Sequence, residues 1–242
     1  MSIVAIVGAK HSPGATTLAV ALASAAPADQ AALVVEADPA GGDIAARARM
    51  SLDPGLLTFA AAGRRGVTDQ LLDGHSQLLA SGAAVLVGPP SPDQAATALA
   101  GVTGSLGEVL TRRAGVAFVD AGRWDPRSPV NDLLGAAAAI VVVFRPTLEG
   151  FEHARMRIAA LGAFDVGIIA APVGERPYAA VEIAAALNGM EVNVIAHDPR
   201  AATAIASGAR SDRWLRRSPL LRSIAPLVER LCVSEVYGVA AR

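Results

Sequence analysis

The chain has 242 residues, of which 52% are hydrophobic, 18% are charged and only 4% are aromatic. This composition is typical of a globular protein and excludes a disordered chain, and a core with so few aromatic rings must consist mainly of Ala, Val, Leu and Ile. The formal net charge of −1 gives no general attraction to nucleic acid or to an acidic membrane surface. The single cysteine, Cys232, excludes an internal disulfide and a multi-cysteine metal site within one chain.

The N-terminal sequence MSIVAIVG lacks the basic segment of a secretory signal and reaches Lys10 before an apolar segment of sufficient length develops. The longest apolar runs, such as residues 135–144, are much shorter than the roughly 20 residues that cross a bilayer. We therefore expect a cytoplasmic protein.

Short β-branched runs alternate with longer stretches rich in Ala and Leu along most of the chain. Strands are predicted at residues 3–7, 32–36, 84–87, 115–120, 138–144, 166–170 and 192–196. Helices are predicted at residues 14–25, 94–111, 148–161, 178–187, 199–207 and 219–232, whereas residues 41–82 are less regular. The pattern predicts an α/β fold in three layers, with a doubly wound, mainly parallel sheet of about seven or eight strands. We expect one domain over residues 1–242.

The first predicted strand leads into a candidate phosphate-binding loop. A regular loop of this kind reads G-x-x-x-x-G-K-[ST], whereas residues 9–16 read AKHSPGAT, so the first glycine and the lysine are missing. Gly14, Thr16 and Thr17 remain, and Lys10 is the only lysine of the chain. Main-chain amides at a helix N-terminus attract anions whatever the side chains are, and Thr16 is placed to hold Mg²⁺. On side chains alone, a chance strand–turn–helix is the simpler interpretation.

Acidic residues follow two further predicted strands. Glu36 and Asp38 end the second strand, Asp43 follows on a loop with two glycines, and Asp120 ends the strand at 115–120. Taken singly, Asp38 fits a turn and Asp43 fits a helix N-cap. In a functional site, Asp120 could reach Mg²⁺ through a water molecule, opposite the threonine of the loop. Ligands bind beyond the carboxyl ends of parallel strands. The loop at residues 9–16, the acidic residues of the segment 36–43 and Asp120 therefore indicate a ligand site more specifically together than any one of them does alone.

On these residues the sequence resembles the MinD/ParA superfamily of P-loop ATPases with a deviant Walker A loop. Within it, the sequence is most similar to the CpaE/TadZ group of pilus-assembly localisation proteins. The deviant loop K-G-G-x-G-K-T-T aligns with residues 10–17, the segment DLDLxxGD with residues 36–43, and the Asp-Thr-Pro-Pro-Gly region with residues 120–122. The resemblance extends over nearly the whole chain.

The resemblance implies a homodimer that holds ATP and Mg²⁺ between its two subunits. It implies that Lys10 reaches the phosphates in the partner subunit and that Lys10 and Asp43 are the catalytic residues. It implies that Mg²⁺ is held by Thr16, Asp38 and Asp120. The nucleotide-binding residues that it implies are Lys10, His11, Ser12, Pro13, Gly14, Ala15, Thr16, Thr17, Asp198 and Pro199.

The loop departs from the family pattern in ways that weaken a nucleotide site. Ala15 replaces the lysine that contacts the β- and γ-phosphates in its own subunit, and Pro13 removes a donor amide. A hydrogen bond to a charged group contributes about 1.5–3 kcal/mol, so we expect ATP binding to be weakened about ten- to a hundredfold. Hydrolysis suffers more, because it depends on charge stabilisation that develops only in the transition state.

Two functions follow from these observations. The first is an ATP-binding dimeric switch, with weak or absent hydrolysis, that helps to position a pilus, secretion, division or partition apparatus through a protein partner. The second is a pseudo-ATPase scaffold that dimerises without nucleotide and recruits a protein partner. An NAD(P)-dependent reductase is disfavoured because the loop lacks G-x-G-x-x-G and no Tyr-x-x-x-Lys pair exists.

Contacts outside the nucleotide site are less well indicated. The resemblance implies no small-molecule substrate beyond ATP, and it implies action at a cell pole, at the inner face of the membrane or on DNA. Five arginines between residues 210 and 222 could bind DNA or acidic lipid. The near-zero net charge instead favours a solvated face for this cluster.

Overall fold

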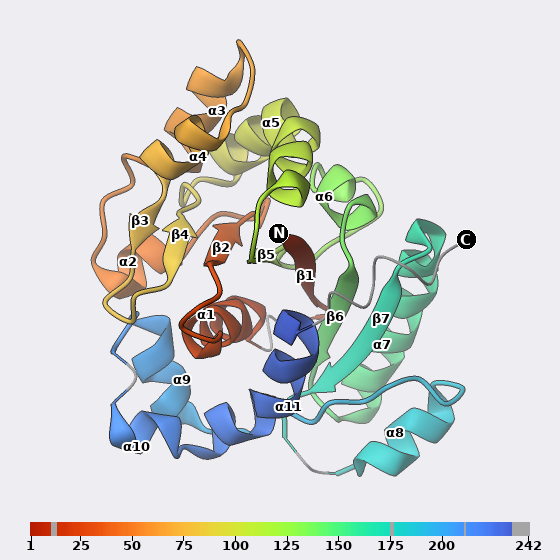
Figure 1. The fold of residues 1–242 in the computed structure, drawn as a ribbon. Coiled ribbons are helices and arrows are strands. Elements are labelled where there is room, and N and C mark those ends of the chain that lie inside the picture. The colour runs from red at the N-terminus through yellow and green to blue at the C-terminus, as the bar shows by residue number, and fades with distance from the viewer. Residues whose placement is uncertain (11–13, 175–176, 211, 234–242) are drawn as a thin grey trace.

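The computed structural model describes residues 1–10, 14–174, 177–210 and 212–233 (Figure 1). These residues form a seven-stranded sheet with helices on both of its faces (Figure 1). The elements follow in the order β1 (Ser2–Gly8), α1 (Ala15–Ala25), β2 (Ala32–Glu36), α2 (Ile44–Ala48), α3 (Leu56–Gly63), α4 (Asp69–His75), β3 (Gln77–Leu78), β4 (Ala84–Leu86), α5 (Pro92–Arg112), β5 (Val116–Asp120), α6 (Asn131–Gly135), β6 (Ala139–Phe144), α7 (Leu148–Leu161), η1 (Gly162–Phe164), β7 (Gly167–Pro172), α8 (Ala180–Ala186), α9 (Pro199–Ala206), α10 (Arg213–Arg216) and α11 (Pro219–Val233).

The strand order is β3-β4-β2-β5-β1-β6-β7, and every pair is parallel except β3 with β4. The chain passes from β1 through α1 to β2 on one side of β1, and from β5 through α6 to β6 on its other side. This is the doubly wound arrangement, so the prediction of a mainly parallel α/β sheet is confirmed. A ligand is expected at the carboxyl ends of the strands near such a reversal of strand order.

The central strands are apolar on both faces because both faces are covered. Along β1, Ile3, Ala5 and Val7 join a core that contains buried residues of α5, α6 and α7, whereas Val4 and Ile6 join a second core with α1, α9 and α11. Successive side chains of a strand point to opposite faces, so the continuous apolar run fills two cores at once. The three predicted layers are therefore present (Figure 1).

Most predicted elements appear with their ends shifted by no more than two residues. The strand predicted at residues 192–196 is wrong, because this segment forms only isolated bridges, from Val192 to Ala170 of β7 and from Ile195 to Val173, which follows β7. The amides of Asn193 and Ile195 donate to Ala170 and Pro172 of β7. Pro172 has no N–H to return to the neighbouring segment, so a continuous ladder cannot form there.

No helix in the described ranges is long and apolar enough to span a membrane.

The start of β5 gives a test of the fold. Gly115 has φ +105°, and a Cβ at this position would lie 2.1 Å from the carbonyl oxygen of Ala31. We expect Gly115→Ala to lower the free energy of unfolding by about 2–3 kcal/mol, because the clash adds to an unfavourable backbone conformation. Gly101→Ala in α5, where a Cβ meets nothing within 4 Å, is the control and should raise stability by about 0.5–1 kcal/mol. Equal urea denaturation midpoints for the two variants would contradict this account.

Candidate functional site

The carboxyl ends of β1, β2 and β5 surround a polar cavity of about 160 Å³ at the N-terminus of α1. Its lining residues come from all the strand-end motifs of the sequence: Gly8, Gly14, Ala15, Thr16, Thr17, Asp38, Gly41, Asp43, Arg47 and Gly122. We call this the phosphate cavity. Five of the residues predicted for the phosphates and for Mg²⁺ therefore share one place: Gly14, Ala15, Thr16, Thr17 and Asp38.

The N-terminus of α1 forms one wall of the phosphate cavity. Gly14 is its N-cap, with φ +111°, and no side chain caps the helix. The amides of the first helical turn have no partner within a helix, so they can bind an anion in the cavity. Ala15 is buried and brings only a methyl group to this wall. His11, Ser12 and Pro13 lie outside the described residues.

Asp120 is fully buried at the end of β5, between β1 and β2. Its Oδ1 accepts a hydrogen bond of 3.1 Å from the amide of Gly122, whereas its Oδ2 has no hydrogen-bond partner among the described residues. Burial raises the pKa of Asp120 to about 7, against the effects of the Thr16 hydroxyl and the Gly122 amide, which lower it. A buried carboxylate oxygen without a partner is the kind of group that a cation or a metal-bound water would satisfy.

Asp38 reaches the same cavity from the loop that follows β2. Its Oδ1 accepts a hydrogen bond of 2.8 Å from the amide of Ala40, and burial raises the pKa of its carboxyl group. Gly122 lies directly against this carboxylate: it has φ +56°, and a Cβ there would lie 2.0 Å from the Cγ of Asp38. Glycine is therefore required for the two strand-end loops to approach each other.

The oxygen atoms of the candidate metal ligands suit a Mg²⁺ ion that is bound together with a phosphate group. In the described ranges no group of three or more His, Cys, Asp or Glu side chains is arranged to hold a metal ion. Mg²⁺ is commonly held by one or two carboxylates together with phosphate oxygens and water, rather than by a complete protein cage. The hydroxyl of Thr16 and the carboxylates of Asp38 and Asp120 match that pattern.

Glu36 has a structural role that the sequence did not reveal. It is only 2% exposed, its Oε1 accepts hydrogen bonds from the amides of Asp43 (2.6 Å) and Ile44 (2.8 Å), and its Oε2 accepts one from Gly88 (2.8 Å). Burial raises the pKa of Glu36, and these amides oppose the rise. Both oxygens are used in fixing the loop between Asp38 and α2, so Glu36 positions the cavity wall without lining it.

Asp43 and Arg47 line the cavity as an exposed ion pair. Asp43 occupies the N-cap position of α2 but makes no capping hydrogen bond with its side chain, and its Oδ2 lies 2.7 Å from the guanidinium of Arg47. The sequence analysis did not single out Arg47. Its spacing of four residues from Asp43 on a helix was the available signal.

Lys10 lies apart from the phosphate cavity of its own chain. Its Nζ is 2.8 Å from Nε2 of His153 on α7, and it lines a different cavity with Thr147 and Glu149. A role of Lys10 across a dimer stays a prediction.

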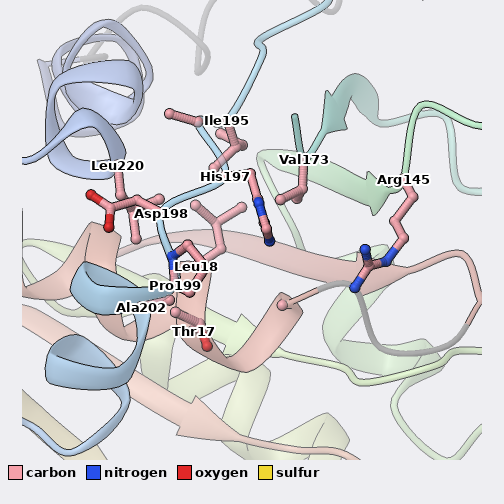
Figure 2. A pocket seen from close by; sticks show the side chains of 12 residues that line it. Thr17, Leu18, Arg145, Val173, Ile195, His197, Asp198, Pro199, Ala202 and Leu220 are labelled. Carbon is pink, nitrogen blue, oxygen red and sulfur yellow. The ribbon is translucent and has the colours of Figure 1, made fainter. Parts of the chain in front are cut away.

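A second cavity, of about 230 Å³, adjoins the phosphate cavity and shares Gly14 and Thr17 with it (Figure 2). Its walls are mostly apolar, and the residues lining it beside those two are Leu18, Arg145, Val173, Ile195, Ala196, His197, Asp198, Pro199, Ala202 and Leu220. The Oδ1 of Asp198 caps α9 by accepting a 3.0 Å hydrogen bond from Ala201. Asp198 and Pro199, predicted as nucleotide contacts, thus lie beside the phosphate cavity. Arg145 and Val173 were not predicted, and only the position of each after a strand could have indicated them.

We expect Glu36→Gln to loosen the loop between Asp38 and α2. An amide cannot accept three hydrogen bonds in this geometry without placing its own N–H₂ group against an amide donor, so the variant should lose about 2–3 kcal/mol of stability. Hydrogen exchange measured by mass spectrometry should become faster at Asp43, Ile44 and Gly88. The exposed Glu149→Gln is the control. Unchanged protection of these amides in Glu36→Gln would contradict the assigned role.

The buried Asp120 also predicts a pH dependence in metal-free buffer. Between about pH 4 and pH 7 an aspartate ionises in the unfolded chain while Asp120 keeps its proton in the folded protein, so stability should fall as the pH rises. Asp120→Asn removes this titration and should be more stable than the wild type at pH 8, by up to about 4 kcal/mol. Urea denaturation at pH 5 and pH 8 in EDTA measures both effects. The same pH dependence in variant and wild type would exclude Asp120 as its source.

No protein-family model matches the chain, and no curated protein matches its sequence. Among solved structures, a ParA family ATPase from Chlorobium tepidum TLS is similar with a TM-score of 0.77 and 17% identity, over 94% of this chain and 97% of that chain. A Cyanothece McdA variant in complex with ATP is similar with a TM-score of 0.68 and 16% identity, over 96% of each chain. The septum site-determining protein MinD from Pyrococcus horikoshii OT3, complexed with Mg-ADP, is similar with a TM-score of 0.64 and 17% identity. The similarity covers 100% of this chain and 99% of that chain.

Similarity at such low identity concerns the fold. The seven-stranded, mostly parallel sheet and its flanking helices match these structures over nearly their whole length. The chain therefore has the P-loop fold of the ParA and MinD ATPases.

Proposed function

We propose that the chain is a single-domain, ParA/MinD-type switch that binds Mg-ATP as a homodimer and hydrolyses it slowly or not at all. The observation that carries this proposal is the phosphate cavity itself. It combines the uncapped N-terminus of α1 with Thr16, Asp38 and the buried Asp120, whose Oδ2 has no partner among the described residues.

The parts of the cavity have separate roles in this proposal. The first-turn amides of α1 bind the phosphate oxygens, and Thr16, Asp38 and Asp120 hold Mg²⁺ directly or through water. Mg²⁺ would neutralise charge on the phosphates. The structures of McdA with ATP and of MinD with Mg-ADP support this assignment, since they share the fold.

The adjoining cavity suits the nucleoside. Val173, Ile195 and Pro199 give it apolar walls that can hold a flat base (Figure 2). Thr17 lines both cavities. The family that the sequence resembles often recognises adenine through an asparagine after the strand that corresponds to β7, whereas residues 172–177 read PVGERP and contain none. Base recognition in this proposal therefore depends on shape more than on a specific hydrogen bond.

Weak hydrolysis follows from the charges around the phosphate cavity. Arg47 is the only cationic side chain among the described residues that line it, and Arg47 is already paired with Asp43. Ala15 supplies no charge, and Lys10 contacts His153 in its own chain. Little positive charge is left to stabilise the transition state, unless a partner subunit contributes its lysine.

In the cell, we propose that the ATP-bound dimer marks a position for a pilus, secretion, division or partition apparatus and recruits a protein partner. It would act from the cytoplasm, at the inner face of the membrane or at a cell pole. The alternative is a pseudo-ATPase scaffold that dimerises without nucleotide. The missing charge at Ala15 and the contact between Lys10 and His153 are the observations that favour this second function.

Isothermal titration with Mg-ATP tests the nucleotide site, and Ala15→Lys is the decisive variant. We expect the wild type to bind weakly and Ala15→Lys to bind about ten- to a hundredfold more tightly, because it restores the missing charge-assisted hydrogen bond. The exposed Arg64→Gln, remote from the cavity, should bind as the wild type does. No binding at several millimolar Mg-ATP by either the wild type or Ala15→Lys would contradict the proposed site.

Light scattering with and without Mg-ATP separates the switch from the scaffold. The switch predicts a dimer that forms only with Mg-ATP and is weakened in Lys10→Ala. A dimer that forms equally without nucleotide and in Lys10→Ala would favour the scaffold.

A further inference from the structure

A separate polar cavity of about 370 Å³ lies between the loop after β2, the loop after β5 and helix α7. We call it the arginine cavity, because Arg123, Arg127 and Arg157 line it. Asp38 is the one residue that it shares with the phosphate cavity among the described lining residues. The two cavities thus meet at Asp38, and the other residues that line the arginine cavity are not part of the proposed nucleotide site.

Arg157 on α7 is held in place but lacks a complete set of hydrogen-bond partners. Its guanidinium lies over the ring of Trp124, 5.6 Å from the ring centroid. Trp124 is itself fixed, since it is 2% exposed and its Nε1 donates a 2.6 Å hydrogen bond to Oδ1 of Asn131. The Nε of Arg157 is buried and has no hydrogen-bond partner among the described residues. A buried donor in this state calls for an acceptor.

The carboxylates near the arginine cavity attract its arginines over a distance but, in the part of the chain that the structure describes, form no ion pair with them. No ion pair joins Arg123, Arg127 or Arg157 to a carboxylate in the described ranges. The two acidic lining residues bond to their own loops instead: Oδ1 of Asp125 accepts from the amide of Arg127 at 2.8 Å, and Oδ1 of Asp38 accepts from the amide of Ala40 at 2.8 Å.

These loop contacts also give the cavity a fixed shape. The amide of Ser128 donates to the carbonyl oxygen of Asp125 at 2.9 Å, and Nδ2 of Asn131 donates to the carbonyl oxygen of Pro126 at 2.9 Å. The arginines of this loop therefore project from a closed turn, next to an arginine that is stacked on a buried ring. Such preorganisation lowers the entropic cost of binding a ligand.

We propose that the arginine cavity binds an oxyanion, the phosphate or carboxylate group of a small soluble ligand. Guanidinium groups bind such groups through paired N–H···O hydrogen bonds, and the planar fork of arginine suits this geometry. The excess of three arginines over two aspartates favours an anion. A volume of about 370 Å³ leaves room for a ligand larger than the oxyanion alone.

The emission of Trp124 reports binding in this cavity, because Arg157 lies against its ring. In a Trp214→Phe background Trp124 is the only tryptophan, so its fluorescence is measured while inorganic phosphate or succinate is added. We expect a saturable change with at least one probe. The tighter of the two probes identifies the ligand as a phosphate or a carboxylate.

Substitutions on this background assign the binding to the cavity. Arg157→Gln should weaken the affinity at least tenfold, whereas Arg155→Gln, on the same helix but outside the cavity, should leave it unchanged. Arg127→Gln, at an exposed loop position, should also weaken it and keeps the test valid if Arg157→Gln does not fold. The proposal is overturned if neither probe gives a saturable change, or if Arg127→Gln and Arg157→Gln bind as tightly as Arg155→Gln.

Discussion

The burial of Asp120 at the carboxyl end of β5 is the constraint on which the candidate site depends. A parallel sheet with helices on both faces brings the ends of β1, β2 and β5 together and removes water from the central strand end. A carboxyl group held there without a full set of partners carries a cost in stability, seen in its raised pKa. Cation binding beside it would remove that cost. A buried carboxyl group that lowers the stability of the fold is a candidate for a functional residue.

Two close contacts hold the other carboxylate of the site, Asp38, against this strand end. Glu36 binds the amides at the start of α2 and so fixes the far end of the loop, while Gly122 allows Asp38 to approach the turn after β5. The loop after β2, which separates the phosphate and arginine cavities, is therefore fixed by contacts at both of its ends. Asp38 lines both cavities.

Much of the fold could be predicted because apolar runs and helical periodicity determine it locally. The strand predicted at residues 192–196 failed because Pro172, on the neighbouring strand, cannot donate a hydrogen bond, and periodicity within one segment carries no information about its neighbour. Gly14 and Thr16 could be placed from the predicted phosphate-binding loop, and Asp38 and Asp120 from their positions at strand ends. The structural role of Glu36 could not be predicted from the sequence. The positions of the three amides that bind it depend on how distant segments pack.

The central claim is that the phosphate cavity, although it lacks the loop lysine, binds a nucleotide with its metal ion. A crystal structure of the protein with Mn²⁺ and a non-hydrolysable ATP analogue tests this most directly, because Mn²⁺ replaces Mg²⁺ and is located by its anomalous scattering. We predict an anomalous peak beside the hydroxyl of Thr16 and the carboxylates of Asp38 and Asp120, with the phosphates on the first-turn amides of α1. A nucleotide bound elsewhere, or no nucleotide at millimolar concentration, would contradict the account.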